Sequence, residues 1–242
     1  MPMLAPYIQL MKLRVVELLL ITTLPTLFLA SHGVPKLGIT VATLLGGTLA
    51  AGAANAFNMV IERESDKLMA RTAKRPLPTG AVTPKAATIF ASGLTVLSLA
   101  IFYLWTTSLA TLLTFLAIFF YVVFYTIGLK RRTSQNIVWG GIAGCMPVLI
   151  GWAAVTNRLS LPAWFFFVLI FFWTPPHFWA LAIKYKDDYA AARIPMLPVV
   201  ATLDSVQYQM WMHTIAMVIS SFALLWSANL AWWIWILNAI LA

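Results

Sequence analysis

Long apolar runs dominate this chain, and short polar or charged segments separate them. A helix of about 20 apolar residues is long enough to cross the hydrocarbon core of a bilayer. The pattern predicts seven such helices and an eighth, shorter one, at about 14–34, 38–61, 86–104, 108–128, 136–156, 162–183, 207–227 and 229–242. We therefore expect an all-α fold, a polytopic transmembrane helix bundle in which residues 1–242 form a single integral-membrane domain.

Composition agrees with this expectation. The chain is 62% hydrophobic and 10% charged, whereas a soluble domain is about half apolar and about one quarter charged. Its one cysteine, Cys145, has no partner for an internal disulfide or a cysteine metal cluster. A net charge of +9 in so apolar a chain is typical of membrane topology and contact with anionic lipid, rather than of nucleic-acid binding.

Basic residues are concentrated on one side of the predicted membrane. Apart from Lys36 and Arg158, every lysine and arginine falls in the N-terminal segment or in the loops after the second, fourth and sixth predicted helices. By the positive-inside rule, these segments are cytoplasmic. We expect a multi-pass protein of the cell inner membrane, with its N-terminus and charged loops in the cytoplasm.

Three oxygen-bearing side chains recur every four residues where the second predicted helix ends. If the helix continues, Asn58, Glu62 and Asp66 lie one turn apart on one face. Oxygen donors in such a row suit a hard cation such as Mg²⁺, which takes its remaining ligands from water and phosphate. Alternatively, these side chains are solvated anchors of a membrane helix that pair with neighbouring cations.

A cationic cluster follows directly. Arg71, Lys74 and Arg75 come next, and Pro76 and Pro78 then begin a loop. Guanidinium and ammonium groups bind phosphate oxygens. A metal-binding face beside such a cluster has the groups needed to hold a diphosphate and to stabilise its departure.

A second basic group follows the fourth predicted helix. Lys130 and Arg131 come after Tyr125 and are either further phosphate donors or a cytoplasmic anchor. We expect Thr133 or Asn136 to cap the fifth helix.

The sixth predicted helix ends in an unusual way. Pro175 and Pro176 are expected to break or kink it, which is tolerated where protein or a cavity satisfies the backbone. His177 follows, and it is either a hydrogen-bonded structural residue or a residue that binds a planar substrate. Its neighbours are Trp173, Phe178 and Trp179.

More charges lie after this helix. Lys184 and Asp188 are four residues apart and form either a simple salt bridge or part of a second cation site on the same diphosphate. Asp187 and Asp188 point in different directions on a helix, so at most one of them reaches a given metal.

Small residues are concentrated in two helices. The second carries Gly46, Gly47 and Gly52 among alanines, and the fifth carries Gly140, Gly141, Gly144 and Gly151. Small residues allow helix backbones to approach closely inside a membrane, so we assign these runs to helix packing.

These motifs together resemble a known family. The resemblance to the first motif of UbiA-type intramembrane prenyltransferases is carried by Asn58-Met-Val-Ile-Glu62-Arg-Glu-Ser-Asp66, Arg71 and Arg75-Pro76-Leu77. The likeness to the branch that farnesylates protohaem IX is carried by Lys130-Arg131-x-Thr133-x-x-Asn136, Thr174-Pro-Pro-His177-Phe-Trp179 and Pro195-Met-Leu-Pro198. The resemblance runs from about Lys12 to the last residue.

The resemblance implies nine membrane helices around a cavity open to the cytoplasm and lipid. It implies Mg²⁺-dependent transfer of a farnesyl group from farnesyl diphosphate to a vinyl carbon of haem b, which gives haem O for respiratory oxidases. Haem A synthase would be a downstream partner. By position, the metal ligands would be Asn58, Glu62, Asp66 and Asp188, and Asp187 would complete the catalytic set. The substrate-binding set would be Arg71, Lys74, Arg75, Tyr125, Lys130, Arg131, Asn136, His177 and Lys184.

The chain departs from the family pattern at three points. Glu62 stands where the family usually has Asp, and Arg193 stands at a usual Gly position. Eight helices are predicted rather than nine, so we expect residues 1–242 to lack the last C-terminal helix.

Two alternatives use the same observations. One keeps the family but changes the acceptor to a quinone-precursor ring or a chlorophyll-type alcohol. The other is a transporter of an anionic substrate, in which the basic loops form the entrance. A transporter needs charged groups near the bilayer midplane, whereas almost all charges of this chain lie toward one face.

Overall fold

The fold is a bundle of long apolar helices. The computed structural model describes residues 4–241, and these residues contain helices and no strand. Seven segments of this part of the chain are long and apolar enough to cross a membrane. They are α2 (Leu13–Ser31), α3 (Leu37–Asp66), α4 (Pro84–Trp105), α5 with η1 (Ser108–Phe119 and Phe120–Leu129), α6 (Asn136–Thr156), α7 (Leu161–Lys184) and α10 (Leu203–Ser227).

Four shorter helices complete the described chain. They are α1 (Ala5–Met11), α8 (Lys186–Ala191), α9 (Leu197–Val200) and the apolar α11 (Trp232–Leu241). The all-α prediction is confirmed, and so are the seven long helices and the shorter eighth, α11. The pattern missed α1, and it placed the start of α10 at 207 instead of Leu203.

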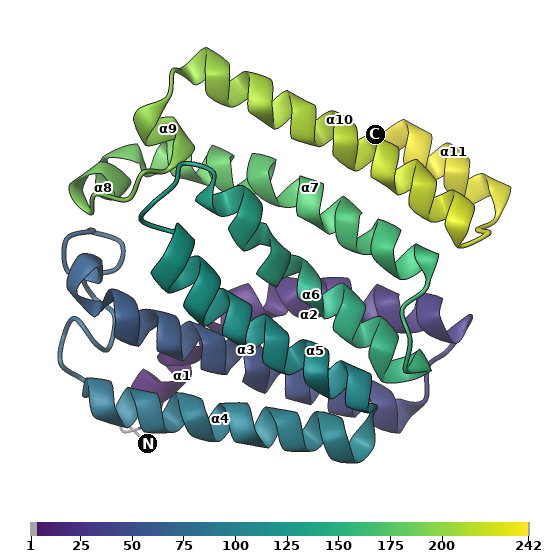
Figure 1. Ribbon diagram of the computed structural model, residues 1–242, viewed down its shortest axis with the longest axis horizontal. Helices are drawn as coiled ribbons and strands as arrows, with labels where there is room; N and C mark the ends of the chain where they lie inside the picture. Colours follow the sequence, from purple (N-terminus) through teal and green to yellow (C-terminus); the bar gives the residue numbers. More distant parts are fainter. Residues whose placement is uncertain (1–3, 242) are drawn as a thin grey trace.

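The long helices lie side by side and their connections gather at two ends (Figure 1). The loop at 67–83, the loop at 130–135 and the α8–α9 segment lie together at one end, where α1 also lies. The connections between α2 and α3, between α4 and α5 and between α6 and α7 lie at the other end. The charged loops that the sequence assigned to one side of the membrane therefore meet in space.

The outer surface of the bundle is apolar. Large side chains such as Val96, Trp211 and Ile219 are exposed, which in a soluble protein of this size would be an aggregation hazard. On helices that satisfy their own backbone hydrogen bonds, such a surface is suited to lipid. The chain is a multi-pass integral membrane protein.

Of the two outcomes expected in α7, a break is wrong, and a kink stays a prediction. Pro175 and Pro176 lie inside a helix that runs without interruption from Leu161 to Lys184. Packing against α6 on one side and α10 on the other holds this segment helical. Thr174 donates from its hydroxyl to the Ile170 carbonyl at 2.8 Å, just before the proline pair. Tertiary contacts therefore outweigh the local preference of proline here.

Glycines bring neighbouring helices into close contact, as predicted. A Cβ at Gly46 would lie 2.8 Å from the Phe102 ring of α4, and Ser98 of α4 donates to the Gly46 carbonyl at 2.7 Å. A Cβ at Gly141 would lie 3.0 Å from Thr174 of α7. By contrast, within the described chain nothing lies within 4 Å of a Cβ placed at Gly47 or Gly144. These two glycines leave space instead of filling it.

The structure accounts for the unusual Arg193. The Arg193 N–H donates to the Ala190 carbonyl and the Ile194 N–H donates to the Tyr189 carbonyl, at 3.0 and 2.9 Å. This is the Schellman ending of a helix, and Arg193 occupies its left-handed position with φ 54°. Glycine is favoured there because it has no Cβ to clash. The hydrogen bonds and the burial of Ile194, which is 1% exposed, keep Arg193 in this conformation.

We predict that Arg193→Gly stabilises the protein. Relief of the left-handed strain gains about 1–2 kcal/mol, and the greater freedom of glycine in the unfolded chain offsets about 0.5–1 kcal/mol of it. The melting temperature in detergent should therefore rise by a few degrees. Arg193→Ala keeps a Cβ at the same φ and serves as the control, with no such rise expected. Equal stabilisation by Ala would show that the arginine side chain, and not the backbone, was responsible.

Candidate active site

The bundle encloses a cavity of about 390 Å³ between α2, α3, η1, α6 and α7. One face of α3 lines it along most of its length, with Thr43, Gly47, Ala50, Ala54, Asn58, Glu62 and Asp66. From Thr43 to Asn58 the helix rises roughly 22 Å, at about 1.5 Å per residue. Small side chains of α3 and larger apolar side chains of the other helices line the part of the cavity near Gly47 and Gly144, and charged side chains line the other end.

At the charged end, each oxygen-bearing side chain of α3 faces one cation. Lys12 Nζ donates to Asn58 Oδ1 at 2.9 Å. Lys130 Nζ lies 2.5 Å from Glu62 Oε1, and Arg75 Nη1 lies 2.7 Å from Asp66 Oδ2. The structure confirms that α3 continues to Asp66, so the three side chains share one face as their spacing requires.

The three cations come from three different segments. Lys12 is the junction between α1 and α2, Arg75 belongs to the loop after α3, and Lys130 follows η1 directly. Two carboxylates thus lie among these cations and Arg71, which also lines the cavity. The site therefore carries an excess of positive charge, which suits an anionic ligand.

Lys12 was not among the sequence-predicted site residues. Its backbone is left-handed, with φ 52°, so that α1 and α2 meet at an angle there. Asn55 Nδ2 donates to the Met11 carbonyl at 3.0 Å and holds the junction against α3. Burial, and after it the charge of Arg75, lowers the pKa of Lys12 to about 7. An anion bound beside Lys12 would favour its charged form.

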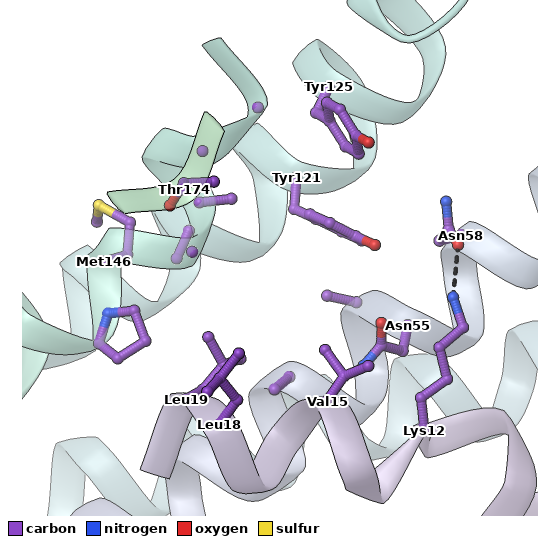
Figure 2. A pocket seen from close by; sticks show the side chains of 18 of the residues that line it. Lys12, Val15, Leu18, Leu19, Asn55, Asn58, Tyr121, Tyr125, Met146 and Thr174 are labelled. Carbon is purple, nitrogen blue, oxygen red and sulfur yellow. Dashed lines mark hydrogen bonds between the residues drawn. The ribbon is translucent and has the colours of Figure 1, made fainter. Parts of the chain in front are cut away.

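Two tyrosines of η1 face the cavity near the charged end (Figure 2). The rings of Tyr121 and Tyr125 are 5.5 Å apart, and Lys130 Nζ lies 6.0 Å from the Tyr125 centroid. In a π-helix, residues four or five apart fall on nearly one line. Tyr121, Tyr125 and Lys130 have that spacing, so the π-helical geometry of η1 turns all three toward the same space.

The charged end fits a hard divalent cation. Asp66 is fully buried, and its Oδ1 has no hydrogen-bond partner in the described chain although the residue lines the cavity. Residues 4–241 contain no group of three or more His, Cys, Asp and Glu side chains close enough to hold a metal. The available donors are thus the two carboxylates and the Asn58 amide oxygen, with a ligand phosphate to complete the set. Hard oxygen donors of this kind are those that Mg²⁺ prefers.

The remaining predicted cations do not all reach the cavity. Arg71 lines it, and its guanidinium lies 5.4 Å above the Tyr185 ring. This contact brings the loop after α3 against the end of α7. Lys74 and Arg131 are exposed and do not line the cavity of the described chain. For these two residues the phosphate-binding assignment stays a prediction.

The acidic residues after α7 lie apart from the cavity wall. Asp187 is exposed and Asp188 half-buried in α8, and neither lines the cavity in the described chain. Lys184 lies 5.7 Å above the Tyr185 ring and, within residues 4–241, forms no salt bridge with Asp188. The simple ion pair considered from the sequence is therefore wrong, and a second metal ligand here stays a prediction.

His177 is exposed and stacks on Trp173, with ring centroids 4.3 Å apart. Trp173 and Phe178 line the cavity, whereas His177 does not line it in the described chain. Two of the three aromatic neighbours named from the sequence therefore contribute to the cavity wall, and His177 stacks on one of them. A role for His177 in binding a planar substrate stays a prediction.

The expected cap of α6 is wrong. Gln135 is the residue before the first helical position and it has no side-chain cap within the described residues. Asn136 is fully buried as the first helical residue, and its Nδ2 donates to the Thr133 carbonyl at 2.7 Å. Asn136 therefore secures the turn after η1. It is not among the residues of the described chain that line the cavity.

Sequence reasoning missed Lys12 and Tyr189. In the sequence, Lys12 indicates only the membrane topology, and no pattern distinguishes Tyr189 from the residues around Asp187 and Asp188. Both line the cavity. Lys12 follows α1 and Tyr189 lies in α8, and both helices lie at the charged end of the bundle (Figure 1). The spacing of residues along the sequence does not indicate where these two short helices pack.

The cavity of this membrane-helix bundle is cationic and rich in oxygen atoms at one end and apolar at the other. Such a cavity is typical of an enzyme whose substrate has an anionic head group on an apolar tail. Comparison identifies the class: the chain belongs to the UbiA prenyltransferase family, whose model matches residues 19–242. The prediction of a prenyltransferase is confirmed, and the transporter alternative is wrong.

Curated relatives indicate a branch within this family. The chain is 55% identical over 219 residues to protoheme IX farnesyltransferase of Renibacterium salmoninarum, covering 90% of this chain and 69% of the relative. It is 51% identical over 236 residues to the enzyme of the same name from Streptomyces avermitilis, covering 98% and 77%.

Solved structures share the fold. A UbiA homolog from Archaeoglobus fulgidus bound to DMAPP and Mg²⁺ superposes with a TM-score of 0.76 at 16% identity, covering 97% of this chain and 82% of that one. The apo UbiA homolog from Aeropyrum pernix K1 gives 0.77 at 19% identity, covering 94% and 84%.

We predict that Gly140→Ala impairs prenyl transfer. A Cβ at Gly140 would overlap the ring of Tyr125, which must then move from its place beside Lys130. The value of kcat/KM should fall by about tenfold to 100-fold, the range seen when a side chain near the reacting groups is misplaced. Gly93→Ala on α4, where nothing lies within 4 Å of the added Cβ in the described chain, is the control. An unimpaired Gly140→Ala enzyme would contradict a role for the position of Tyr125.

Proposed function

We propose that this protein transfers a farnesyl group from farnesyl diphosphate to a vinyl group of haem b, giving haem O. One observation carries the proposal: the three oxygen–cation pairs of α3 lie at the charged end of an otherwise apolar cavity. A prenyl diphosphate has the matching shape, an anionic head on an apolar tail. The relatives named protoheme IX farnesyltransferase support the choice of donor and acceptor.

The charged end is suited to the diphosphate. Lys12, Arg75 and Lys130 now each contact a side-chain oxygen of α3. A bound diphosphate offers these cations phosphate oxygens, which form strong charge-assisted hydrogen bonds. Arg71, at the opening, is suited to receive the outer phosphate. The farnesyl tail then extends along the small residues of α3 toward Gly47 and Gly144, where the cavity has space.

Asn58, Glu62 and Asp66 would hold Mg²⁺ on the diphosphate. The structures of the Archaeoglobus fulgidus homolog with Mg²⁺ support the choice of metal. When bound, the ion supplies positive charge that stabilises the leaving diphosphate. These three proposed ligands are the side chains that pair with Lys12, Arg75 and Lys130 in the structure, and they would be free to hold the ion once the diphosphate binds these cations. Asp188 is proposed as a ligand from the second acidic motif.

In the reaction, the bond between C1 of the farnesyl group and the diphosphate oxygen breaks, and its electron pair leaves with diphosphate. The π electrons of the haem vinyl group form a new bond to C1. Water adds to the resulting cation and loses a proton, which leaves a hydroxyethylfarnesyl side chain. Preorganised cations stabilise the charge on the leaving group, and the faces of Tyr121 and Tyr125 stabilise the allylic cation.

Orientation follows from charge. The loops that gather near the site carry nearly all lysines and arginines of the chain, so we place this end at the cytoplasmic face of the cell inner membrane. Both substrates and the product are then exchanged with the cytoplasm or the lipid. Haem A synthase is the proposed consumer of the product. We also propose that residues 1–242 act as a single domain.

The direct test is synthesis of haem O. Purified protein with farnesyl diphosphate, haem b and Mg²⁺ should form haem O and diphosphate, identified by mass spectrometry. Acceptors of the quinone-precursor and chlorophyll type should give no comparable product. If the farnesyl group were transferred to one of these acceptors and no haem O formed, the proposed acceptor would be wrong. The assignment as a prenyltransferase would stand.

We predict that Asp66→Asn lowers kcat by at least about 100-fold, the usual effect of removing one group that stabilises transition-state charge. The substitution keeps the shape of the Asp66 side chain but removes its charge. The Oδ1 of Asp66 has no hydrogen-bond partner in the part of the chain that the structure describes. Glu64→Gln is the matched control, because Glu64 is exposed and, among residues 4–241, its salt bridges are those with Arg63 and Lys67 on the surface. Full activity of Asp66→Asn would remove Asp66 from the site.

We predict that Lys12→Met raises the KM for farnesyl diphosphate by about tenfold to 100-fold, because a hydrogen bond to a charged group contributes about 1.5–3 kcal/mol. The KM for haem should change little. Lys36→Met, at the opposite end of the bundle, is the control. An unchanged KM for the donor in Lys12→Met would leave Lys12 a structural residue of the α1–α2 junction.

A further inference from the structure

The π-helical segment η1 has an effect beyond turning its tyrosines inward. Its backbone bonds span five residues; for example, the Lys130 N–H donates to the Tyr125 carbonyl at 2.9 Å. Such turns are rare and occur frequently at functional sites. No proline lies in Phe120–Leu129 to explain it. One side chain depends on this five-residue spacing of the backbone hydrogen bonds.

Thr126 is that side chain. In the α-helices of the described chain, threonine hydroxyls other than that of Thr43, which has no partner, donate to a carbonyl three or four residues earlier. Thr95 donates to Ala91 in this way, and Thr114 donates to Ala110. Thr126 instead donates to the Tyr121 carbonyl, five residues earlier, at 2.8 Å. The π-turn therefore gives its hydroxyl a direction that an α-helix would not.

That direction brings the hydroxyl to Asn58. Asn58 Nδ2 donates to Thr126 Oγ1 at 3.3 Å, and both residues are buried, at 2% and 3% exposed. On its other side, Asn58 Oδ1 accepts from Lys12 Nζ at 2.9 Å (Figure 2). The Thr126 hydroxyl uses its hydrogen in the bond to the Tyr121 backbone carbonyl, so toward Asn58 it presents a lone pair and can only accept.

The consequence is a fixed orientation of the Asn58 amide. Rotated by half a turn, the amide would direct its oxygen at the Thr126 lone pair and its N–H₂ group at Lys12 and the cavity. The oxygen is the only atom of this side chain that can bind a metal. Partners of this kind, which orient a ligand without touching the metal, tune affinity strongly.

We propose that Thr126 is a positioning residue: through the π-turn of η1, its hydroxyl holds the Asn58 amide oxygen toward a divalent cation bound with the prenyl diphosphate. The inference rests on the proposed function for the identity of that ligand. A purely structural role, in which the hydroxyl only satisfies the Tyr121 carbonyl, makes a different prediction. It would alter the stability of the fold without altering the requirement for metal.

The experiment measures binding of farnesyl diphosphate by calorimetry, in the absence of haem, at increasing Mg²⁺. In Thr126→Val the half-saturating Mg²⁺ concentration should rise about 10- to 100-fold, the range for loss of a ligand-orienting partner. Thr126→Ser retains the hydroxyl and should stay near the wild-type value. Thr95→Val removes a comparable hydroxyl from α4, away from the cavity, and should leave it unchanged.

Melting temperatures, measured in parallel, separate loss of fold from loss of position. If Thr126→Val does not fold, the smaller Thr126→Ala makes the same test. The proposal is overturned if folded Thr126→Val or Thr126→Ala has a wild-type Mg²⁺ requirement, or if Thr126→Ser shows the same rise as the valine. If the wild-type protein itself does not bind farnesyl diphosphate with Mg²⁺, the proposed function fails instead.

Discussion

The architecture of this protein depends on the contacts between one row of oxygens on α3 and three cations from elsewhere in the chain. Asn58, Glu62 and Asp66 are buried, and buried charges are tolerated only when paired. Lys12, Lys130 and Arg75 provide that pairing and draw three otherwise separate segments onto α3. Removal of one partner from such a pair typically costs about 3–5 kcal/mol. The same groups that would bind a diphosphate thus also hold the charged end of the bundle together.

The small side chains along the rest of α3 determine where neighbouring helices pack and where the cavity remains. Gly46 allows α4 to approach, while Gly47, one position on, borders empty space in the described chain. Neighbouring positions on one helix therefore have opposite functions, one in packing and one in leaving a cavity. Because lipid provides no hydrophobic drive for helices to associate, close contact at small residues is what positions them. The chamber is a consequence of where that contact is made and where it is not.

Much of this could be predicted. The four-residue spacing of Asn58, Glu62 and Asp66 predicted their common face. Pro76 and Pro78 predicted a loop, although α3 already ends at Asp66 and Arg75 lies within that loop. The backbone at Arg193 is left-handed, with a φ of 54°, which explains why the family usually has Gly at this position. The prediction was poorer after α7: the continuous helix through Pro175 and Pro176 was missed, and His177 does not line the cavity in the described chain. Those predictions were based on the local preferences of single residues, and helix packing outweighs these preferences in the structure.

By itself, the sequence determined the membrane-spanning helices, the end of the bundle that carries the charge, and the oxygen row on α3, because hydrophobic length and helical periodicity are local properties. Only the tertiary structure decided which cation meets which oxygen, that Lys12 belongs to the site, and that a π-turn directs Thr126 to Asn58. Those contacts join residues 46 and 68 positions apart. They depend on helix register and close packing between segments, and no short pattern in the sequence encodes these.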